Sequence, residues 1–390
     1  MAEYKMVRLG DVCEQINGVS YKPADVYDSL TEKTTILLRA NNIFEDKLNY
    51  DELVFVDKKR ISENQYMKKG DILICASSGS KHLVGKAACL TEDKDLTFGA
   101  FCKVLRPKTV NPEYIKHYFF SPSYRTEISR LSEGANINNI KAADLDNLKI
   151  PLPSESIQNK IAKRLDKCVK IINNQKKALE KYDILIKSRF IEMFGDIRNQ
   201  EKYKGIPLSN LCKTMTGGTP PTSKPEYYEG TIPWITTVSL GPNHIDGKNA
   251  KGYITEEAIK NSATKLIPVG NILFGTRVGV GKSSINDVDI CTNQDIIALI
   301  GIDESRYSKL FIKHVLDQYQ PYFDSIKKGA TILGITTDDV KKSLIPDVSL
   351  SLQKEFENFV QQIDKSKFAV QKSLEKAETL YKSLMQQYFA

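Results

Sequence analysis

Two segments decide the fold of this chain, because they have the same length and related sequences. The first is SESIQNKIAKRLDKCVKIINNQKKALEKYDILIKSRFIEMF at residues 154–194, and the second is SLSLQKEFENFVQQIDKSKFAVQKSLEKAETLYKSLMQQYF at residues 349–389. When residues 134–195 are aligned with residues 329–390, roughly 19 of the 62 pairs are identical. Unrelated segments share far fewer residues, so the chain contains an internal repeat.

The residues that precede each segment repeat more loosely. Ile115-Lys116-His117 recurs as Ile312-Lys313-His314, and the glycine-led run Gly70 to Leu73 recurs as Gly270 to Leu273. These matches divide the chain into two heads and two tails. The expected divisions are a first head at 1–153, a helical spacer at 154–195, a second head at 196–348 and a second spacer at 349–390.

Each tail carries apolar residues at steps of three and four, which is typical of a helix with one apolar face. Ser154 and Ser349 are expected N-caps. A helix of ~40 residues is about 60 Å long, and its apolar face needs a partner. We predict that the two helices pair as an antiparallel coiled coil; the alternative is that each packs on its own head. The expected pairing residues are Ile161, Leu165, Ile172, Leu179, Ile186, Phe356, Ile363, Leu374, Tyr381 and Leu384.

Each head contains short apolar runs between polar turns, such as 36–38, 53–56 and 296–300, and these runs predict strands. Helical patches are expected at 114–120 and 309–316. The predicted fold class is therefore α+β. Two mixed α/β domains alternate with two long paired helices, in an internal two-fold repeat.

Composition limits what the chain can be. Its 390 residues are 41% hydrophobic and 27% charged, which is typical of a globular protein that buries cores without disulfides. No apolar run approaches the ~18 residues of a membrane span, and the first residues lack the apolar core of a signal peptide. The seven cysteines form no C-x-x-C pair. We expect a cytoplasmic protein with reduced thiols, and its net charge of +8 is compatible with a polyanionic partner.

Two motifs suggest catalysis but depart from the required pattern. Residues 275–283, GTRVGVGKS, resemble a phosphate-binding loop, but its first glycine would fall at Thr276 and a turn-like sequence follows. Asn111-Pro112-Glu113-Tyr114 resembles the N-P-P-Y motif of DNA amino-methyltransferases, with Glu113 in place of the second proline. Asn111 as a helix N-cap, with Ser308 in the same role in the second head, is the simpler interpretation. No His, Cys, Asp or Glu cluster has metal-ligand spacing, so we expect no metal and no catalysis by this chain.

The polar loops of the two heads match in position but differ in chemistry. Arg39 to Asn42 corresponds to Thr236 to Ser239, and the residues after the two glycine-led strands also correspond. Base edges are read by Arg, Lys and short polar side chains. This pattern is therefore expected of two heads that share one backbone arrangement and read different targets. The alternative is that these residues are merely solvated. The candidate DNA-binding residues are Arg39, Asn41, Asn42, Ser77, Ser78, Ser80, Lys81, His82, Asn136 and Asn138 in the first head, and Thr219, Ser223, Lys224, Thr236, Thr237, Arg277 and Thr331 in the second.

With these features, the whole chain resembles the specificity (S) subunits of type I restriction–modification systems. The second head carries the family-like TGGTPPTSKPEYY at 216–228, followed by Ile-Pro-Trp-Ile at 232–235. Each head also ends in a proline, Pro151 or Pro346, that leads to a glutamine in the helix. The first head departs from the pattern, with NGVSYKP at 17–23. Its assignment depends on the repeat.

The resemblance implies two target recognition domains that read double-stranded DNA, one half of a bipartite gapped target each. It also implies that the helices set the gap and dock two modification subunits, which use S-adenosylmethionine to methylate adenine. Two restriction subunits, which use ATP and Mg²⁺, can join such complexes. This chain itself would hold no cofactor. The alternatives are a nuclease or methyltransferase acting alone, and a non-catalytic protein-binding scaffold with tandem recognition heads.

Overall fold

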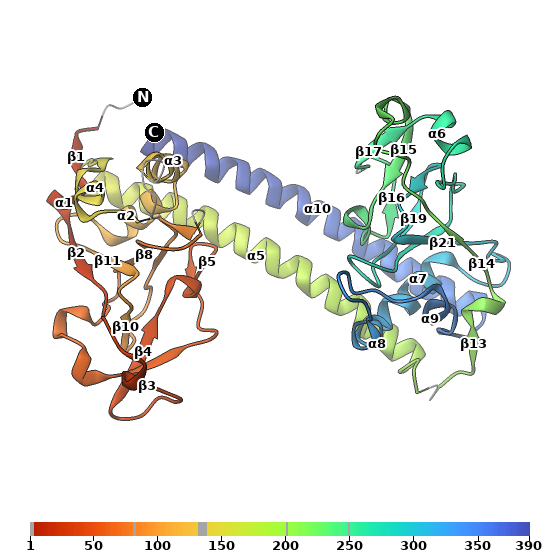
Figure 1. Ribbon diagram of the computed structural model, residues 1–390, viewed down its shortest axis with the longest axis horizontal. Helices are drawn as coiled ribbons and strands as arrows, with labels where there is room; N and C mark the ends of the chain where they lie inside the picture. The colour runs from red at the N-terminus through yellow and green to blue at the C-terminus, as the bar shows by residue number, and fades with distance from the viewer. Residues whose placement is uncertain (1–3, 81–82, 132–138, 200–201, 249) are drawn as a thin grey trace. The chain divides into compact units, whose positions relative to one another are not determined.

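The computed structural model describes residues 4–80, 83–131, 139–199, 202–248 and 250–390. The chain divides into two compact units. Unit 1 comprises Met1–Lys176 and Gln371–Ala390, and unit 2 comprises Lys177–Val370. Each unit therefore contains one head and a portion of both long helices, which are labelled α5 and α10 in Figure 1.

The prediction of one long helix in each tail is confirmed. Helix α5 (Glu155–Phe194) and helix α10 (Leu350–Phe389) each have 40 residues. Ser349 caps α10 as predicted, because its Oγ accepts a hydrogen bond from the Leu352 N–H at 3.3 Å. Ser154 offers α5 only its backbone carbonyl, which accepts from Ile157 and Gln158 at 2.9 Å each.

The head of unit 1 contains two four-stranded sheets. The antiparallel sheet has the order β2-β11-β8-β9, with bounds Cys13–Asn17, Cys102–Pro107, Ile72–Cys75 and Ala87–Cys89. The second sheet has the order β10-β4-β7-β3, with bounds Leu96–Phe98, Thr34–Leu38, Val54–Asp57 and Val26–Tyr27. Two short pairs complete the head, β1-β12 (Met6–Arg8, Lys149–Pro151) and β5-β6 (Ile43–Phe44, Lys47–Leu48).

The head of unit 2 contains a five-stranded sheet of order β14-β21-β18-β19-β16. Its bounds are Lys213–Thr216, Ile296–Ile300, Ile272–Gly275, Ser283–Asn286 and His244–Ile245. A three-stranded sheet has the order β17-β15-β20, with bounds Gly252–Ile254, Ile232–Ile235 and Cys291–Thr292. Strand β13 (Gly205–Pro207) pairs with β22 (Leu344–Pro346).

Both heads also contain short helices. In unit 1 they are α1 (Leu9–Val12), α2 (Pro112–Phe119), α3 (Pro122–Leu131) and α4 (Ala142–Asn147). In unit 2 they are α6 (Glu256–Lys260), α7 (Lys309–Gln318), α8 (Gln320–Ile326) and α9 (Thr337–Lys341). The N-cap predictions for Asn111 and Ser308 are confirmed, because each side chain accepts a backbone N–H in the first turn of α2 or α7.

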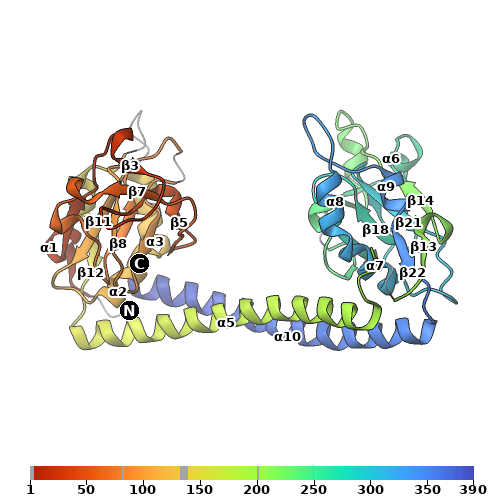
Figure 2. The same ribbon diagram turned by 90° about the horizontal axis from the view of Figure 1, so that it is seen from below.

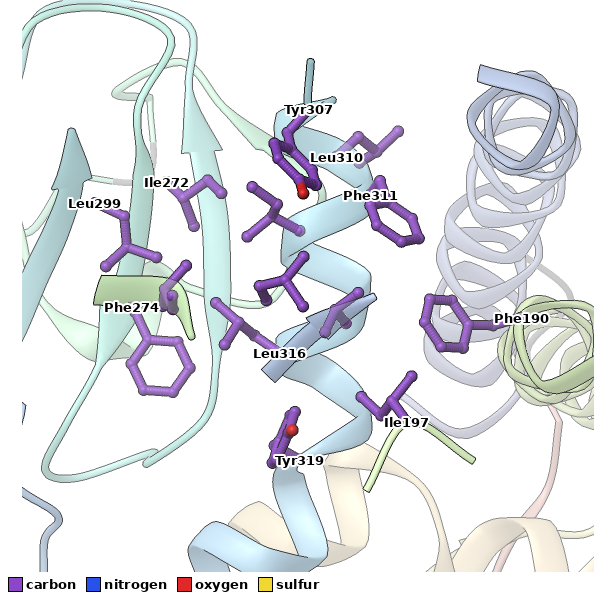
Figure 3. Close-up of a cluster of buried hydrophobic side chains, with 14 of the residues drawn as sticks. Phe190, Ile197, Ile272, Phe274, Leu299, Tyr307, Leu310, Phe311, Leu316 and Tyr319 are labelled. Carbon is purple, nitrogen blue, oxygen red and sulfur yellow. The ribbon is translucent and has the colours of Figure 1, made fainter. Parts of the chain in front are cut away.

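The core of unit 2 joins the head to both long helices. Figure 3 shows α7 between the sheet and the two long helices, with Phe190 of α5 facing it. The Phe190 ring lies 5.4 Å from the ring of Phe356 on α10, and the Phe194 ring lies 4.9 Å from that of Phe311 on α7. All four of these rings are buried, so the helix surfaces complete the core of the head.

Unit 1 has a corresponding core. Ile161 and Leu165 of α5 pack with Tyr114 of α2 and with Phe389 of α10. The rings of Tyr114 and Phe389 lie 5.2 Å apart. The head again depends on residues from both tails, which are distant in the sequence; Figure 2 shows α2 beside α5 in this unit.

Within each unit, the portions of α5 and α10 contact each other and run antiparallel. In unit 1, Arg164 donates to the Tyr388 hydroxyl at 3.1 Å and Gln175 donates to Ser373 at 3.2 Å. In unit 2, Arg189 pairs with Glu355 at 3.0 Å and Lys367 pairs with Asp183 at 2.5 Å. In both units, the residue numbers rise along one helix and fall along the other.

The predicted pairing residues divide into two groups. Five are buried, namely Ile161, Leu165, Ile186, Phe356 and Leu374, and five are half-buried, namely Ile172, Leu179, Ile363, Tyr381 and Leu384. Four of the buried residues, all except Leu374, belong to the cores that the helices share with the heads. The apolar stripe of each long helix therefore packs against a head as well as against the other long helix.

A buried glutamine ties each long helix to its head. Gln158 accepts the Asn111 N–H at 2.9 Å and donates to the Pro153 carbonyl at 2.8 Å. In unit 2, Gln353 accepts the Ser308 N–H at 2.8 Å and donates to the Val348 carbonyl at 2.9 Å. Each glutamine thus satisfies the backbone N–H of the residue that caps α2 or α7.

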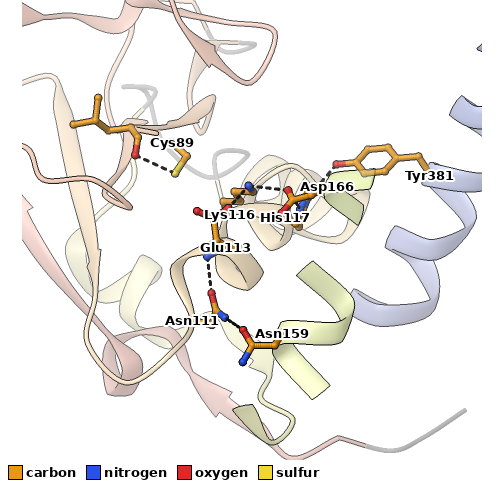
Figure 4. Close-up of polar contacts among 9 residues, drawn as sticks. Cys89, Asn111, Glu113, Lys116, His117, Asn159, Asp166 and Tyr381 are labelled. Carbon is orange, nitrogen blue, oxygen red and sulfur yellow. Dashed lines mark hydrogen bonds and ion pairs between the residues drawn. The ribbon is translucent and has the colours of Figure 1, made fainter. Parts of the chain in front are cut away.

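A cluster of charged groups adds to this contact in unit 1 (Figure 4). Asp166 of α5 accepts from Lys116 at 2.8 Å and from His117 at 3.0 Å. The other ring nitrogen of His117 lies 3.4 Å from the Tyr381 hydroxyl of α10. Burial lowers the pKa of His117, while the hydrogen bond to Asp166 partly opposes the shift. The cluster therefore joins α2 to both long helices through His117.

We predict that Phe190→Ala will lower the free energy of unfolding by about 3–5 kcal/mol, because it leaves a cavity where α5, α7 and α10 meet. Phe368→Ala is the matched control, since Phe368 is 70% exposed on α10. It should change stability by no more than about 0.5 kcal/mol. Chemical denaturation of both variants measures the difference, and equal effects would contradict this description of the core.

Candidate nucleic-acid interface

Four loops converge in the head of unit 1, and we call them loop cluster 1. They follow strands β2, β4, β8 and β10 and comprise residues 18–21, 39–42, 76–80 and 99–101. Backbone hydrogen bonds hold them together. The Gly99 N–H donates to the Leu38 carbonyl at 2.9 Å, and the N–H groups of Ala76 and Ser77 both donate to the Phe101 carbonyl at 3.0 Å.

The loops of cluster 1 border a groove of about 840 Å³. Four candidate residues from the sequence line this groove, namely Arg39, Asn41, Ser77 and Ser78. Tyr21 and Phe101 line it as well. The structure thus brings together side chains from four separate sequence segments, with hydrogen-bonding groups beside two aromatic rings.

Asn42 lies inside the loop and not on its surface. Its side chain is fully buried and accepts the Arg39 N–H at 2.9 Å. Its amide donates to the carbonyls of Asn49 and Asp51 at 3.0 and 2.9 Å. Asn42 therefore shapes the loop that presents Arg39 and Asn41, and in this conformation it cannot reach a ligand in the groove.

Loop cluster 2 in the head of unit 2 has the same backbone connections. It comprises residues 217–220, 236–239, 276–279 and 293–295, which follow β14, β15, β18 and β20. The Asn293 N–H donates to the Ile235 carbonyl at 3.1 Å, and the Thr276 N–H donates to the Asp295 carbonyl at 2.8 Å. These bonds correspond one by one to those of Gly99 and Ala76 in loop cluster 1.

The Gly-Gly pair of the TGGTP segment is explained by close packing. A Cβ at Gly217 would lie 2.1 Å from the Thr292 Oγ1, and one at Gly218 would lie 2.5 Å from the Ala263 carbonyl carbon. The Gly218 carbonyl also accepts the indole N–H of Trp234 at 3.1 Å. The two family-like pieces of the second head are therefore in direct contact.

Candidate residues of the second head occupy three kinds of position. Arg277, Thr219, Ser223, Lys224 and Thr331 are exposed. Thr219 donates to the Gln294 side chain at 2.6 Å, and Lys224 donates to the Tyr227 hydroxyl at 3.0 Å. Thr236 is half-buried, whereas Thr237 is buried. Thr237, like Asn42, lies within its loop and in this conformation is not available to a ligand.

Four candidates, Lys81, His82, Asn136 and Asn138, lie outside the described residues. Ser80 is half-buried at the end of loop cluster 1. The segment that follows residue 138 joins the cluster, because the Ile140 N–H donates to the Ala76 carbonyl at 2.8 Å. The corresponding Ile335 N–H donates to the Thr276 carbonyl at 2.9 Å and brings residues 328–334 beside Arg277.

The sequence did not reveal Phe101 and Gln294 as site residues. Phe101 is 71% exposed, although most phenylalanines in the described ranges are buried. Gln294 is exposed at the corresponding turn of the second head. For Gln294 the signal in the sequence was its place in a polar loop just before the predicted strand at 296–300, and Phe101 had no such signal.

The two catalytic-looking motifs have structural explanations. Residues 276–282 form a turn between β18 and β19, and a strand follows where a phosphate-binding loop requires a helix. Asn111 accepts the Glu113 N–H at 2.8 Å as an N-cap. Within the described ranges, no three His, Cys, Asp or Glu side chains are grouped so that they could hold a metal ion. Among these same residues, no helix has the length and hydropathy of a membrane span.

The fold defines a protein with two similar heads, each of which carries a loop cluster with corresponding backbone hydrogen bonds. A family model described as the type I restriction modification DNA specificity domain matches residues 1–197 and again residues 200–378. The chain therefore belongs to the type I restriction–modification DNA specificity family.

Curated relatives have the same family name. The chain is 43% identical over 173 residues to the type I restriction enzyme StySPI specificity subunit of Salmonella potsdam, covering 44% of this chain and 37% of that subunit. It is 32% identical over 290 residues to the EcoKI specificity subunit of Escherichia coli K12, covering 71% of this chain and 61% of that subunit. The chain thus spans less than two thirds of the length of these relatives.

Two solved structures have the same fold. One is a type I restriction–modification system S subunit from M. genitalium, with a TM-score of 0.57 at 15% identity, covering 100% of this chain and 96% of that one. The other comes from a study of complex assembly and conformational transition of the type I R-M system. It has a TM-score of 0.58 at 17% identity and covers 100% and 98% of the two chains.

We predict that Asn42→Ala will destabilise the protein by about 2–3 kcal/mol, because it leaves buried backbone groups without partners. The neighbouring Asn41→Ala is the matched control, since Asn41 is exposed and its amide donates to the Glu52 carboxylate at 3.4 Å. It should leave the midpoint of thermal unfolding nearly unchanged. If both variants behaved alike, the structural role assigned to Asn42 would be wrong.

Proposed function

We propose that this chain is the non-catalytic specificity subunit of a type I restriction–modification complex. In this proposal each head reads one half of a bipartite, gapped target in double-stranded DNA. The observation that carries the proposal is the pair of loop clusters, which have matching backbone hydrogen bonds and different side chains. A shared frame with variable side chains is what two readers of different base sequences require.

The proposed base-reading residues are those candidates that line the groove of the first head, or that are exposed or half-buried in the second head. In the first head these are Arg39, Asn41, Ser77 and Ser78, and in the second they are Thr219, Thr236, Arg277 and Thr331. Ser80, Ser223 and Lys224 are proposed at the edges of the clusters. The net charge of +8 supports attraction to phosphates, so we expect affinity for DNA to fall steeply with salt. Because the proposed target is DNA, we also propose that the protein is cytoplasmic.

We further propose that α5 and α10 pair along their length as an antiparallel coiled coil and so set the gap between the half-sites. The contacts within each unit support this arrangement, because Gln175 meets Ser373 in unit 1 and Asp183 meets Lys367 in unit 2. The internal repeat supports a two-fold design. The proposed domains are residues 1–153 and 196–348 for recognition, with spacers at 154–195 and 349–390.

The helices also offer surfaces for two modification subunits. Several large apolar side chains on them are exposed, namely Ile171, Ile184, Leu185 and Ile191 of α5 and Phe368 and Leu380 of α10. Exposed apolar residues on a helix favour contact with another protein. We propose that the modification subunits supply S-adenosylmethionine chemistry, and that restriction subunits with ATP and Mg²⁺ can join them.

We predict that co-expression of this chain with a type I modification subunit from the same genome will methylate adenines in one bipartite, gapped motif. Single-molecule sequencing of the host DNA reads the motif directly. Replacing residues 1–153 with the first head of another family member should change one half of the motif and leave the other half intact.

Control cells should express the modification subunit alone, which should leave the motif unmethylated. An assembled complex that methylates no gapped motif would contradict the proposed function and favour a protein-binding scaffold. A head exchange that altered both half-sites would contradict the separate roles of the heads.

A further inference from the structure

Phe101 and Asp295 occupy the same place in the two heads. Each is the third residue after a corresponding strand, β10 or β20, and the backbone carbonyl of each accepts a hydrogen bond from the loop after β8 or β18. These bonds measure 3.0 Å from Ala76 to Phe101 and 2.8 Å from Thr276 to Asp295. The backbone at this position is therefore held by the same hydrogen bond in both heads, while the side chain is Phe in one head and Asp in the other.

In the second head, the side chain at this position supports Arg277, a polar residue proposed to read bases. The Asp295 carboxylate accepts from the Asn293 amide at 3.0 Å and lies 3.9 Å from the Arg277 guanidinium. Its side chain is only 16% exposed, whereas that of Arg277 is 56% exposed. Asp295 thus holds one side of Arg277 and leaves the rest of the guanidinium free to face a ligand.

In the first head the same position presents an apolar ring. Phe101 is 71% exposed and lines the groove with Arg39, Asn41, Ser77 and Ser78. Its backbone is held on both sides, because the Ala76 and Ser77 N–H groups donate to its carbonyl and the Cys102 N–H donates to the Gly99 carbonyl at 2.8 Å. Phe101 is thus an exposed aromatic residue on a fixed turn, beside the hydrogen-bonding groups that line the groove.

An apolar ring among polar readers needs an apolar partner on the DNA. In the major groove, the thymine 5-methyl is the apolar group on the base edges, and aromatic and aliphatic side chains contact it. Covering that methyl would also remove an exposed ring from water.

We propose that Phe101 is a specificity-determining residue that contacts the 5-methyl of a thymine in the half-site read by the first head. This inference deepens the proposed function and rests on it. Its chemistry is the apolar counterpart of the polar contact proposed for Arg277, which Asp295 supports from the equivalent place in the second head.

The test uses the assembled complex with the modification subunit and the target motif found by methylation mapping. Binding is measured on a set of duplexes, in each of which one thymine of the first head's half-site is replaced by uracil. One replacement should weaken binding of the wild-type complex about fourfold, which corresponds to the loss of one buried methyl group. The Phe101→Ala complex should bind that uracil-containing duplex and the unmodified duplex equally well.

Phe44→Ala is the matched control, because Phe44 is 59% exposed in the same head and does not line the groove. That variant should keep the fourfold discrimination. Phe101→Leu should keep part of it, since leucine retains an apolar side chain.

Three results would overturn the proposal while leaving the proposed function intact. They are a half-site without thymine, a wild-type complex that tolerates every uracil replacement, and a Phe101→Ala complex that still discriminates. If the wild-type complex methylates no gapped motif, the proposed function itself fails, and this result is seen before any variant is made.

Discussion

A buried glutamine fixes each head to its long helix, and the packing of both heads builds on this contact. Gln158 and Gln353 are buried in the first turns of α5 and α10, where each accepts a backbone N–H from the residue that caps α2 or α7. An unpaired amide in that position would cost about 1–3 kcal/mol. The two glutamines therefore fix the short helix of each head against the long helix before any apolar packing is counted.

Packing then makes head and helix one core. In unit 2, Phe190 and Phe356 of the long helices meet Phe311 of the head, and in unit 1 Phe389 meets Tyr114. Neither head can complete its core without residues from both tails. The α2 and α7 sides of the heads pack against the long helices, whereas the loop clusters take no part in these two cores. Side chains in the loop clusters can therefore differ between the heads without changing this packing.

Much of this organisation could be predicted from the sequence, because it depends on regular patterns. The three-and-four spacing gave the long helices, and Asn111 and Ser308 were recognisable as N-caps. The roles of individual loop residues depend on tertiary contacts and could not be predicted. Asn42 and Asn41 are adjacent and chemically identical, yet one is buried with three backbone partners and the other is exposed.

Phe101 shows the opposite case. Phenylalanine usually indicates a core position, and only the folded turn reveals that this ring is exposed in a groove. The helix stripe was also more complex than its periodicity indicated, because Ile161, Leu165, Ile186 and Phe356 serve the heads. Periodicity identifies the buried face of a helix but does not specify which neighbour covers it.

The role of the two long helices as a spacer is tested by lengthening both helices together and mapping the methylated motif. Seven residues would be inserted after Lys177 and seven after Lys372, which are equivalent in the repeat, so that an antiparallel pair keeps its register. Each insertion adds about 10 Å of helix, or about three base pairs of DNA. We expect a gap that is longer by about three base pairs between unchanged half-sites. An assembled complex that methylates the original motif with its original gap would contradict this spacer role.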